Sequence, residues 1–317
     1  MLARLLRRLV FTQAAVGAAL GYLLFHFADT APWSALAGAV LLPILSTFLV
    51  GLITALRSKA DEPASMWWRS VVGEFWASIL IFLLRQPWTR HTPGVLPAIG
   101  PTSQVPVVLV HGYICNHRVW DTVARSLRAQ GHSVLAVDLE PLFTSIDNYA
   151  RTIEAAVMDI CQQTGSRQVA LVGHSMGGLA IRAWMRARGS ERVARVITLG
   201  TPHAGTQIEP NTRTPNGKQM CWQSPWLAEL AASESDAVRA RIHIAITPQD
   251  NIVYPQRAQV LPGLQPTVFE GIGHLQMCLD ASVIGWMNGL LKGLQTESPG
   301  ASSTAPTHDA NREGVAI

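Results

Sequence analysis

The sequence predicts an α/β fold: a mostly parallel sheet of about six strands with helices on both faces, preceded by a transmembrane helical hairpin. Two observations predict it. Short apolar runs alternate with helical stretches after residue 104, which is typical of a parallel sheet covered on both sides. The first 60 residues instead hold two long uncharged apolar runs. We place the boundaries at residues 1–60 for the hairpin, 61–103 for a helix and a linker, 104–294 for the α/β domain and 295–317 for a tail.

Residues 9–27 and 35–56 are the two apolar runs, and each is long enough as a helix to cross a bilayer core of about 30 Å. Pro43 interrupts the second run, which membrane helices tolerate. A cleaved signal peptide is the alternative for the first run, because basic residues precede it. The second run follows almost at once, so the pair predicts a transmembrane hairpin.

Basic residues gather at both outer ends of the hairpin. Arg4, Arg7 and Arg8 precede the first run, and Arg57 and Lys59 follow the second, whereas the loop between the runs has no lysine or arginine. The positive-inside rule predicts that both ends lie in the cytoplasm. The α/β domain that follows is then expected on the cytoplasmic side.

A third apolar stretch, residues 70–84, is shorter and contains Glu74. Indole and basic side chains surround it: Trp67, Trp68, Arg69, Trp76, Arg85 and Trp88. This composition predicts a helix that lies in the membrane interface or packs on the domain. If the stretch crosses the bilayer instead, the domain lies on the opposite, periplasmic side.

Six apolar runs are the predicted strands of the domain: residues 105–110, 133–138, 168–172, 195–199, 241–247 and 267–270. Apolar residues at steps of three and four from Ile146 to Ile160 predict a helix with one buried face, and a further helix is expected over residues 282–291. Residues 89–103 predict a linker, and residues 296–317 a disordered tail. Residues 207–225 are either a short cap, which would leave the site open, or a surface loop.

The segment Gly173-His174-Ser175-Met176-Gly177 carries the G-x-S-x-G pattern of a nucleophile elbow. An apolar strand precedes it and a helical run follows it, which is the context that the pattern requires. The sharp turn would expose the Ser175 hydroxyl. It would also leave the Met176 N–H at a helix N-terminus, where it can donate to an oxyanion.

A serine nucleophile needs a histidine base and an orienting carboxylate, in the chain order Ser, Asp, His for this arrangement. Asp250 follows the strand 241–247, and His274 follows the strand 267–270 beside a glycine. The rival histidines flank the serine, precede it or lie by other strands: His111, His174, His203 and His243. The rival acids do not fit the chain order Ser, Asp, His: Asp138 and Glu140 precede Ser175, and Asp280 follows His274.

The strand 105–110 ends in His111-Gly112-Tyr113, where a second oxyanion donor is expected at the Tyr113 amide or just after it. Residues 104–291 resemble the α/β-hydrolases of the bacterial lipase and esterase type. The resemblance is carried by His111-Gly112, Gly173–Gly178, Leu199-Gly200-Thr201-Pro202-His203-Ala204-Gly205, Asp250 and Gly273-His274. The resemblance implies serine hydrolysis with Ser175, Asp250 and His274. The first two strands of that family lack room here, so a shortened sheet is expected. A bacterial inner membrane is the implied location.

Composition narrows the remaining possibilities. The chain is 48% hydrophobic and 15% charged, and its net charge of +4 comes without a basic stripe or nucleic-acid motif, which argues against nucleic-acid binding. The four cysteines have no metal-ligand spacing, so we expect no metal and no cofactor. Cys161 is expected in the core. Cys115 is the one thiol that lies near the predicted oxyanion loop.

The sequence thus predicts a membrane-anchored serine hydrolase that cleaves carboxylic esters, in particular lipid acyl esters. Its expected partners are the bilayer and an acyl-ester substrate, and the oligomeric state stays open. Acyl transfer to an alcohol or amine would use the same residues. A membrane interaction protein on an inactive hydrolase scaffold is the alternative from another class, because a fold does not prove an activity.

Overall fold

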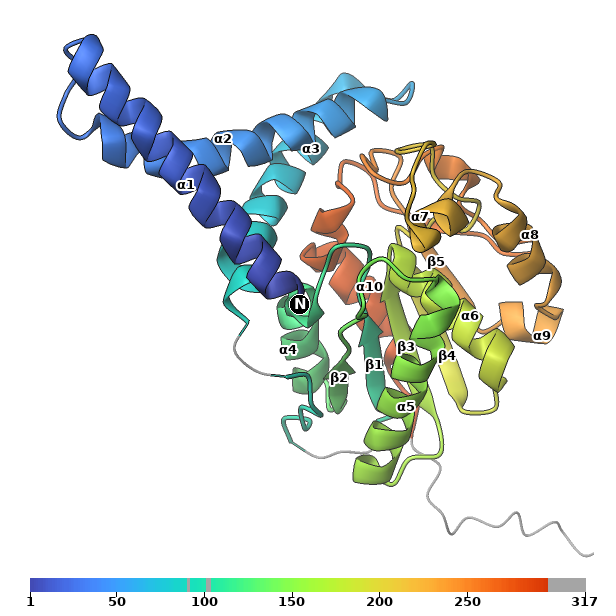
Figure 1. Ribbon diagram of the computed structural model, residues 1–317. Helices are drawn as coiled ribbons and strands as arrows, with labels where there is room; N and C mark the ends of the chain where they lie inside the picture. The colour runs from blue at the N-terminus through green and yellow to red at the C-terminus, as the bar shows by residue number, and fades with distance from the viewer. Residues whose placement is uncertain (90–91, 101–103, 296–317) are drawn as a thin grey trace, which may run out of the picture.

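Figure 1 shows the computed structural model, which describes residues 1–89, 92–100 and 104–295. Within these residues, one sheet of six parallel strands has the order β2-β1-β3-β4-β5-β6. The strands are β1 (Val107–Val110), β2 (Val134–Ala136), β3 (Val169–His174), β4 (Val193–Leu199), β5 (Ile242–Ile246) and β6 (Thr267–Val268). The predicted parallel sheet is therefore confirmed, with each strand within a few residues of its expected limits.

The strand order reverses at β1, which has β2 on one side and β3 on the other. Leu109 lies opposite Ala136 of β2 and opposite Val172 of β3. In open parallel sheets such a switch point leaves a crevice at the carboxyl ends of the strands, where ligands bind. The loops that leave β1 and β3 meet at this crevice.

Helices cover both faces of the sheet: α4 (Asp121–Ala129) and α10 (Ala281–Leu291) on one face, α5 (Ala150–Thr164) and α6 (Met176–Arg188) on the other. Val108 and Leu171 are buried in the core with α5 and α6, whereas Leu109 and Val172 are buried in the core with α4 and α10. This alternation is the period of two that a strand covered on both faces requires. The two cores hold β1 and β3 rigidly.

Shorter helices complete the domain: α7 (Pro215–Met220), α8 (Pro225–Ala232) and α9 (Asp236–Arg239). Short 3-10 helices are η2 (Gln86–Trp88), η3 (His117–Trp120), η4 (Ile146–Tyr149), η5 (Gln256–Ala258) and η6 (Leu275–Cys278). The predicted helix 146–160 is therefore η4 continued by α5. Residues 207–225 contain α7, whose first turn is capped by the Thr214 hydroxyl accepting from the Gly217 N–H at 3.2 Å, rather than forming an irregular loop throughout.

Two long helices, α1 (Leu2–Phe27) and α2 (Ser34–Arg57), form the predicted hairpin and project from the domain in Figure 1. Helix α1 begins seven residues earlier than the apolar run, so that Arg4, Arg7 and Arg8 lie inside its first turns. Long Arg side chains can extend from a helix to polar surroundings, so a charged turn need not end a helix. Within the described residues, three helical stretches are long and apolar enough to cross a membrane: Leu2–Phe27, Ser34–Arg57 and Ala64–Trp88.

The third stretch consists of α3 (Ala64–Ser78), the π segment η1 (Ile79–Arg85) and η2, and it returns from the hairpin to the domain. Ala77 and Ile81 are buried in the domain core with β1. The Trp67 indole N–H donates to the Ala55 carbonyl of α2 at 3.1 Å. Helix α3 thus packs against both the hairpin and the domain.

The segment predicted as a linker takes part in the sheet edge. Leu96 pairs antiparallel with Val134 of β2, and the two backbone N–H···O bonds measure 2.8 and 2.9 Å. Residues 90–91 and 101–103 of this segment lie outside the described residues, as does the predicted tail 296–317. The described part of the linker is therefore a short edge pairing, which the Pro/Gly content did not reveal.

Candidate active site

The turn between β3 and α6 places Ser175 in a strained backbone conformation, with φ 55° and ψ −130°. A positive φ is unfavourable for a residue with a side chain, and packing on both sides must hold it. The Ser175 N–H donates to the Leu199 carbonyl of β4 at 2.9 Å, and the Ser175 carbonyl accepts from the Gly178 N–H at 3.1 Å. The side chain lines a large cavity at the carboxyl ends of the strands.

Gly112, just after β1, lies directly against the serine side chain. A Cβ at this position would lie 2.7 Å from the Ser175 Cβ and 3.2 Å from its Oγ. Any larger residue would push the serine out of place, so the close approach requires glycine. The strand-end dipeptide predicted beside the elbow therefore lies there.

Asp250 and His274 form a buried hydrogen-bonded pair. The His274 Nδ1 lies 2.7 Å from the Asp250 Oδ2, and the other carboxylate oxygen accepts from the Ile252 and Val253 N–H groups at 2.9 and 2.7 Å. The carboxylate is thus fixed by the turn after β5. Nδ1 is then the protonated nitrogen of a neutral His274, which leaves the lone pair on Nε2.

The electrostatics of this pair favour a basic imidazole. Burial alone would lower the pKa of His274, but the Asp250 charge, its hydrogen bond and the Glu74 charge raise that pKa above its usual value. A raised pKa makes Nε2 a better proton acceptor near neutral pH. In this arrangement His274 can therefore act as a general base.

Ser175 and His274 line the same cavity, and Asp250 lies behind His274. In the described part of the chain, the Ser175 hydroxyl and the His274 Nε2 hydrogen-bond neither to each other nor to another group. Hydrogen bonds between catalytic groups are often long before a substrate binds. The structure thus brings the three predicted residues to one edge of the sheet, with the serine–histidine contact still open.

Two residues that the sequence analysis did not assign hold the His274 loop. The His174 Nε2–H donates to the His274 carbonyl at 3.1 Å, and the two rings are in contact at an angle of 46°, with centroids 4.6 Å apart. Burial, followed by the His274 charge, lowers the pKa of His174 well below its usual value, so its ring stays neutral.

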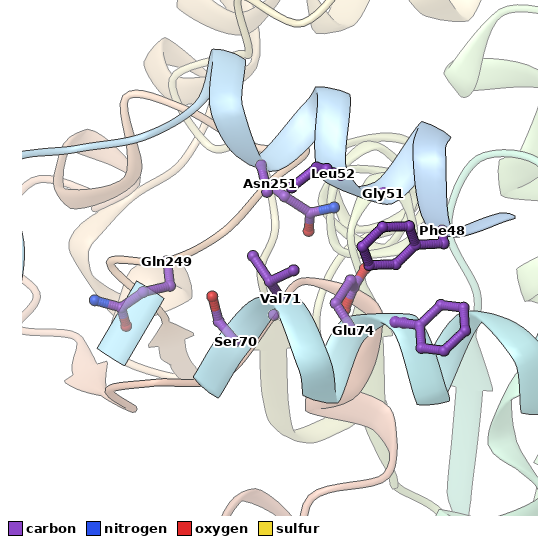
Figure 2. Close-up of a pocket in the computed structure, with 11 residues that line it drawn as sticks. Phe48, Gly51, Leu52, Ser70, Val71, Glu74, Gln249 and Asn251 are labelled. Atoms are coloured by element: carbon purple, nitrogen blue, oxygen red, sulfur yellow. The ribbon is translucent and has the colours of Figure 1, made fainter. Parts of the chain in front are cut away.

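Glu74 of α3 supports the same loop from the other side. Its buried carboxylate accepts from the Leu275 N–H at 2.8 Å and from the Gln276 N–H at 3.0 Å, at the start of η6. Figure 2 shows Glu74 pointing from α3 towards α2, in a small pocket that Asn251 also lines. The only sequence signal for this contact was an acid inside an apolar stretch, which indicates a buried partner but not which one.

Two amides are placed as the sequence predicted for oxyanion donors. The Met176 N–H starts α6, and Tyr113 follows Gly112 and lines the cavity. Among the described residues, neither amide N–H has a hydrogen-bond acceptor. The next residue, Ile114, has a φ of 51°, which marks a tight bend of this loop. Both N–H groups remain available to a ligand oxygen.

Two of the rival histidines, His203 and His111, have structural partners. The Arg182 guanidinium is fully buried, pairs with Glu234 at 2.6 and 2.9 Å, and donates to the His203 Nδ1 at 3.2 Å. The other His203 nitrogen lies 3.0 Å from the Thr198 hydroxyl, and burial followed by the Arg182 charge lowers the pKa of His203 well below its usual value. The His111 Nδ1–H donates to the Gly112 carbonyl at 2.8 Å, and its Nε2 accepts from the Leu139 N–H at 3.0 Å.

The cysteines do not form disulfides with one another, and all four are free. Cys115 is buried near the oxyanion loop, and burial raises its pKa to about 12, so the thiol is a poor nucleophile. Cys161 packs partly buried against the core, as expected.

The cavity has a volume of about 620 Å³, and the domain supplies only part of its wall. Residues of the 207–225 segment line it, among them Ile208, Thr212 and Met220, and so do α1 and α2. The short segment 207–225 thus covers part of the site, and helices α1 and α2 cover the side that it leaves free. The apolar composition of the hairpin indicates an anchor and does not reveal this role.

The domain is similar to known proteins in sequence. Residues 106–257 match a family model described as palmitoyl protein thioesterase, a region that contains Ser175 and Asp250 and ends before His274. The triacylglycerol lipase of Burkholderia plantarii is 32% identical over 167 residues, which cover 50% of this chain and 44% of that protein. The triacylglycerol lipase of Pseudarthrobacter phenanthrenivorans is 32% identical over 115 residues, 33% of this chain and 35% of that protein. This chain thus spans less than half the length of these relatives.

The fold is also found among solved structures. The mature form of the Bacillus licheniformis lipase BlEst2 aligns with a TM-score of 0.53 and 19% identity, over 63% of this chain and 98% of that chain. The similarity covers the α/β domain at the level of fold. The chain has the α/β-hydrolase fold, and the fold prediction is confirmed.

Proposed function

We propose that this protein is a membrane-anchored serine hydrolase that cleaves carboxylic esters, in particular the acyl esters of lipids. One observation carries the proposal. A strained serine elbow and a histidine backed by a buried aspartate line one large, mostly apolar cavity. A strained serine whose hydroxyl lines the cavity, close to a base of raised pKa, is the arrangement that activates a serine nucleophile.

In the proposed reaction, the Ser175 Oγ attacks the ester carbonyl carbon while its proton passes to the His274 Nε2. Asp250 holds the tautomer and stabilises the imidazolium that forms. The tetrahedral intermediate expels the alcohol, which takes the proton from Nε2 and leaves an acyl-enzyme. Water then attacks the acyl carbon by the same route, which releases the carboxylic acid and restores the serine.

The Met176 and Tyr113 N–H groups are the proposed oxyanion donors. Negative charge develops on the carbonyl oxygen in the transition state, and preorganised amides stabilise it without reorientation. One amide lies at the N-terminus of α6 and the other in the Ile114 bend, and neither has a competing acceptor in the described chain. The helix dipole of α6 adds to this stabilisation.

The membrane anchor is part of the proposal. Helices α1 and α2 expose large apolar side chains, and Leu20 and Leu36 are more than half exposed. Such surfaces are unfavourable in water and ordinary in a bilayer. Ala77 of α3 and Ile81 of η1 lie in the domain core, which favours two spans and a cytoplasmic domain over a third crossing. Protease treatment of sealed inverted vesicles tests this side: the domain should be digested, and protection would contradict it.

A second reaction, hydrolysis of an acyl thioester, is favoured by the match of residues 106–257 to the palmitoyl protein thioesterase model. A thioester passes through the same tetrahedral intermediate with a better leaving group, so the same residues could act on it. Turnover of matched palmitoyl oxygen esters and thioesters by one preparation separates the two reactions.

A fluorophosphonate probe tests the central proposal. We expect covalent labelling of the purified protein at Ser175, and ester hydrolysis that is lost together with labelling in Ser175→Ala. Analysis of products with and without an added alcohol distinguishes hydrolysis from acyl transfer. A folded wild-type protein that is neither labelled nor active would support the inactive scaffold instead.

A further inference from the structure

Helices α1 and α2 touch closely at the end of the hairpin that is far from the domain. A Cβ on Gly17 would lie 2.0 Å from the Gly38 carbonyl oxygen, and one on Gly21 would lie 2.0 Å from the Ser34 carbonyl oxygen. Small residues at a spacing of four allow membrane helices to approach this closely. The Ser34 hydroxyl also donates to the Gly21 carbonyl at 2.7 Å.

Towards the domain the two helices diverge, as Figure 1 shows. The Gln13 amide donates to the Ser46 hydroxyl at 2.9 Å, one turn closer to the domain than Gly17. Beyond this bond, residues of both helices line the cavity that holds Ser175 and His274: Leu6, Leu9 and Val10 from α1, and Val50, Gly51 and Thr54 from α2. The hairpin is therefore narrow at its tip and open above the serine.

The open end is fixed at both helices, α2 to the domain and α1 to η2. The Thr54 hydroxyl of α2 accepts from the Asn251 amide at 3.0 Å, next to Asp250. The Arg7 guanidinium of α1 donates to the Pro87 carbonyl at 3.0 Å. These bonds hold the helices apart at the cavity, so the opening is a built feature of the fold.

We propose that the space between the diverging ends of α1 and α2 admits the acyl chain of a bilayer lipid sideways to Ser175, and that the hairpin is the wall of the acyl pocket. The proposal rests on the proposed function and names its substrate class: membrane-resident lipids with long acyl chains. Because α1 and α2 carry exposed apolar side chains and the cavity between their diverging ends is mostly apolar, a chain that moves between them keeps largely apolar surroundings. A soluble short-chain ester gains nothing from this path.

A fluorophosphonate with a sixteen-carbon chain and a photoreactive diazirine at its far end tests the path in nanodiscs. Labelling of Ser175 fixes one end of the chain, and light then cross-links the other end to the wall it reaches. We expect cross-links within residues 6–13 or 46–54. Cross-links confined to residues 206–221 would overturn the inference while leaving the proposed function intact. Absence of serine labelling would refute the proposed function, and the inference with it.

Substitutions in the wall provide a second test. Val10→Trp fills the pocket from α1, and Gly51→Leu fills it from α2, where an added Cβ has no neighbour within 4 Å. We expect the ratio of kcat/KM for a palmitoyl ester to that for an acetyl ester to fall at least about tenfold in each variant. Val16→Trp on the outer face of α1 is the matched control and should keep the wild-type ratio. An unchanged ratio in both wall variants would contradict the inference.

Discussion

The domain wall and the hairpin wall of the cavity differ in how tightly their groups are fixed. On the domain side, Asp250 accepts three hydrogen bonds, and the His274 loop is held by His174 and Glu74. On the hairpin side, the cavity is lined by uncharged side chains, aliphatic ones such as Leu9 and Val50 beside polar ones such as Gln13, with few polar contacts to the domain. The difference follows from the tasks we propose: proton transfer needs exact geometry, whereas an acyl chain needs only apolar volume.

Chemistry and substrate choice can thus be placed in separate parts of the chain. The proposed chemistry belongs to the loops that end β1, β3 and β5 and the loop after β6, as in other parallel sheets. The proposed acyl selection belongs to a hairpin that precedes the domain in sequence. Changes in the domain wall should therefore abolish turnover of all esters, and changes in the hairpin should alter which ester is preferred.

Removal of the nucleophile should give the largest effect. We expect Ser175→Ala to lower ester hydrolysis at least about 10⁴-fold for acetyl and palmitoyl esters alike, because both need the same covalent step. Initial rates with the two esters check this result, and an unchanged melting temperature confirms that the variant is folded. Residual palmitoyl hydrolysis near the wild-type rate would place the chemistry elsewhere in the molecule.

Loss of the orienting carboxylate should be nearly as severe and should move the pH dependence. The base must be neutral, so kcat/KM falls as the pH drops through the pKa of His274. Asp250 raises that pKa. The acidic limb of the wild-type pH profile of kcat/KM should therefore have its midpoint above the usual imidazole pKa of about 6.5. We expect Asp250→Asn to lower kcat/KM about 10³- to 10⁴-fold and to shift the limb to lower pH. If the acidic limb of the Asp250→Asn profile stays at the wild-type pH, a group other than His274 is responsible for it.

A smaller effect is expected at Glu74, which acts through the His274 loop and belongs to α3. Glu74→Gln removes the charge and weakens the bonds to Leu275 and Gln276, so we expect kcat to fall about tenfold. Because the Glu74 charge helps to raise the pKa of His274, the acidic limb should also move to lower pH. A purely structural role would lower stability without moving that limb.

Glu62→Gln is the matched control for this charge removal. Glu62 precedes α3 and pairs with Arg257, whose side chain is largely exposed, and exposed ion pairs contribute little. We expect turnover within about twofold of the wild type and an unmoved acidic limb. Equal losses in both variants would mean that Glu74 only supports α3.

Much of the domain could be predicted from the sequence because its signals are local. The elbow around Ser175 combines a strand, a turn and a helix within a few residues, and the strands appear as short apolar runs bounded by turns. The structure places Asp250 and His274 at the same sheet edge, and their catalytic roles stay predictions. Their positions could be expected because parallel strands end at one edge.

The parts that could not be predicted depend on contacts between distant segments. Glu74 and Leu275 are 201 residues apart, and neither a hydrophobic pattern nor a motif connects them. The apolar runs indicate that α1 and α2 are helices, but the period of a helix does not state which neighbour covers which face. An anchor and a pocket wall have the same composition, so the open end of the hairpin became visible only in the fold.

The smallest effect on turnover is expected where α1 and α2 touch, far from the serine. Gly38→Ala would place a Cβ 2.0 Å from the Gly17 carbonyl oxygen, so the helices must separate, and we expect a loss of about 1–3 kcal/mol in the free energy of unfolding. Gly51→Ala on the same helix is the control, because its Cβ meets nothing within 4 Å. It should keep or raise stability, since alanine favours a helix over glycine. Melting curves in nanodiscs compare the two, with acetyl-ester turnover expected to stay within about twofold of the wild type for Gly38→Ala. Equal stability of the two variants would contradict close packing at Gly17 and Gly38, and with it the narrow tip of the hairpin.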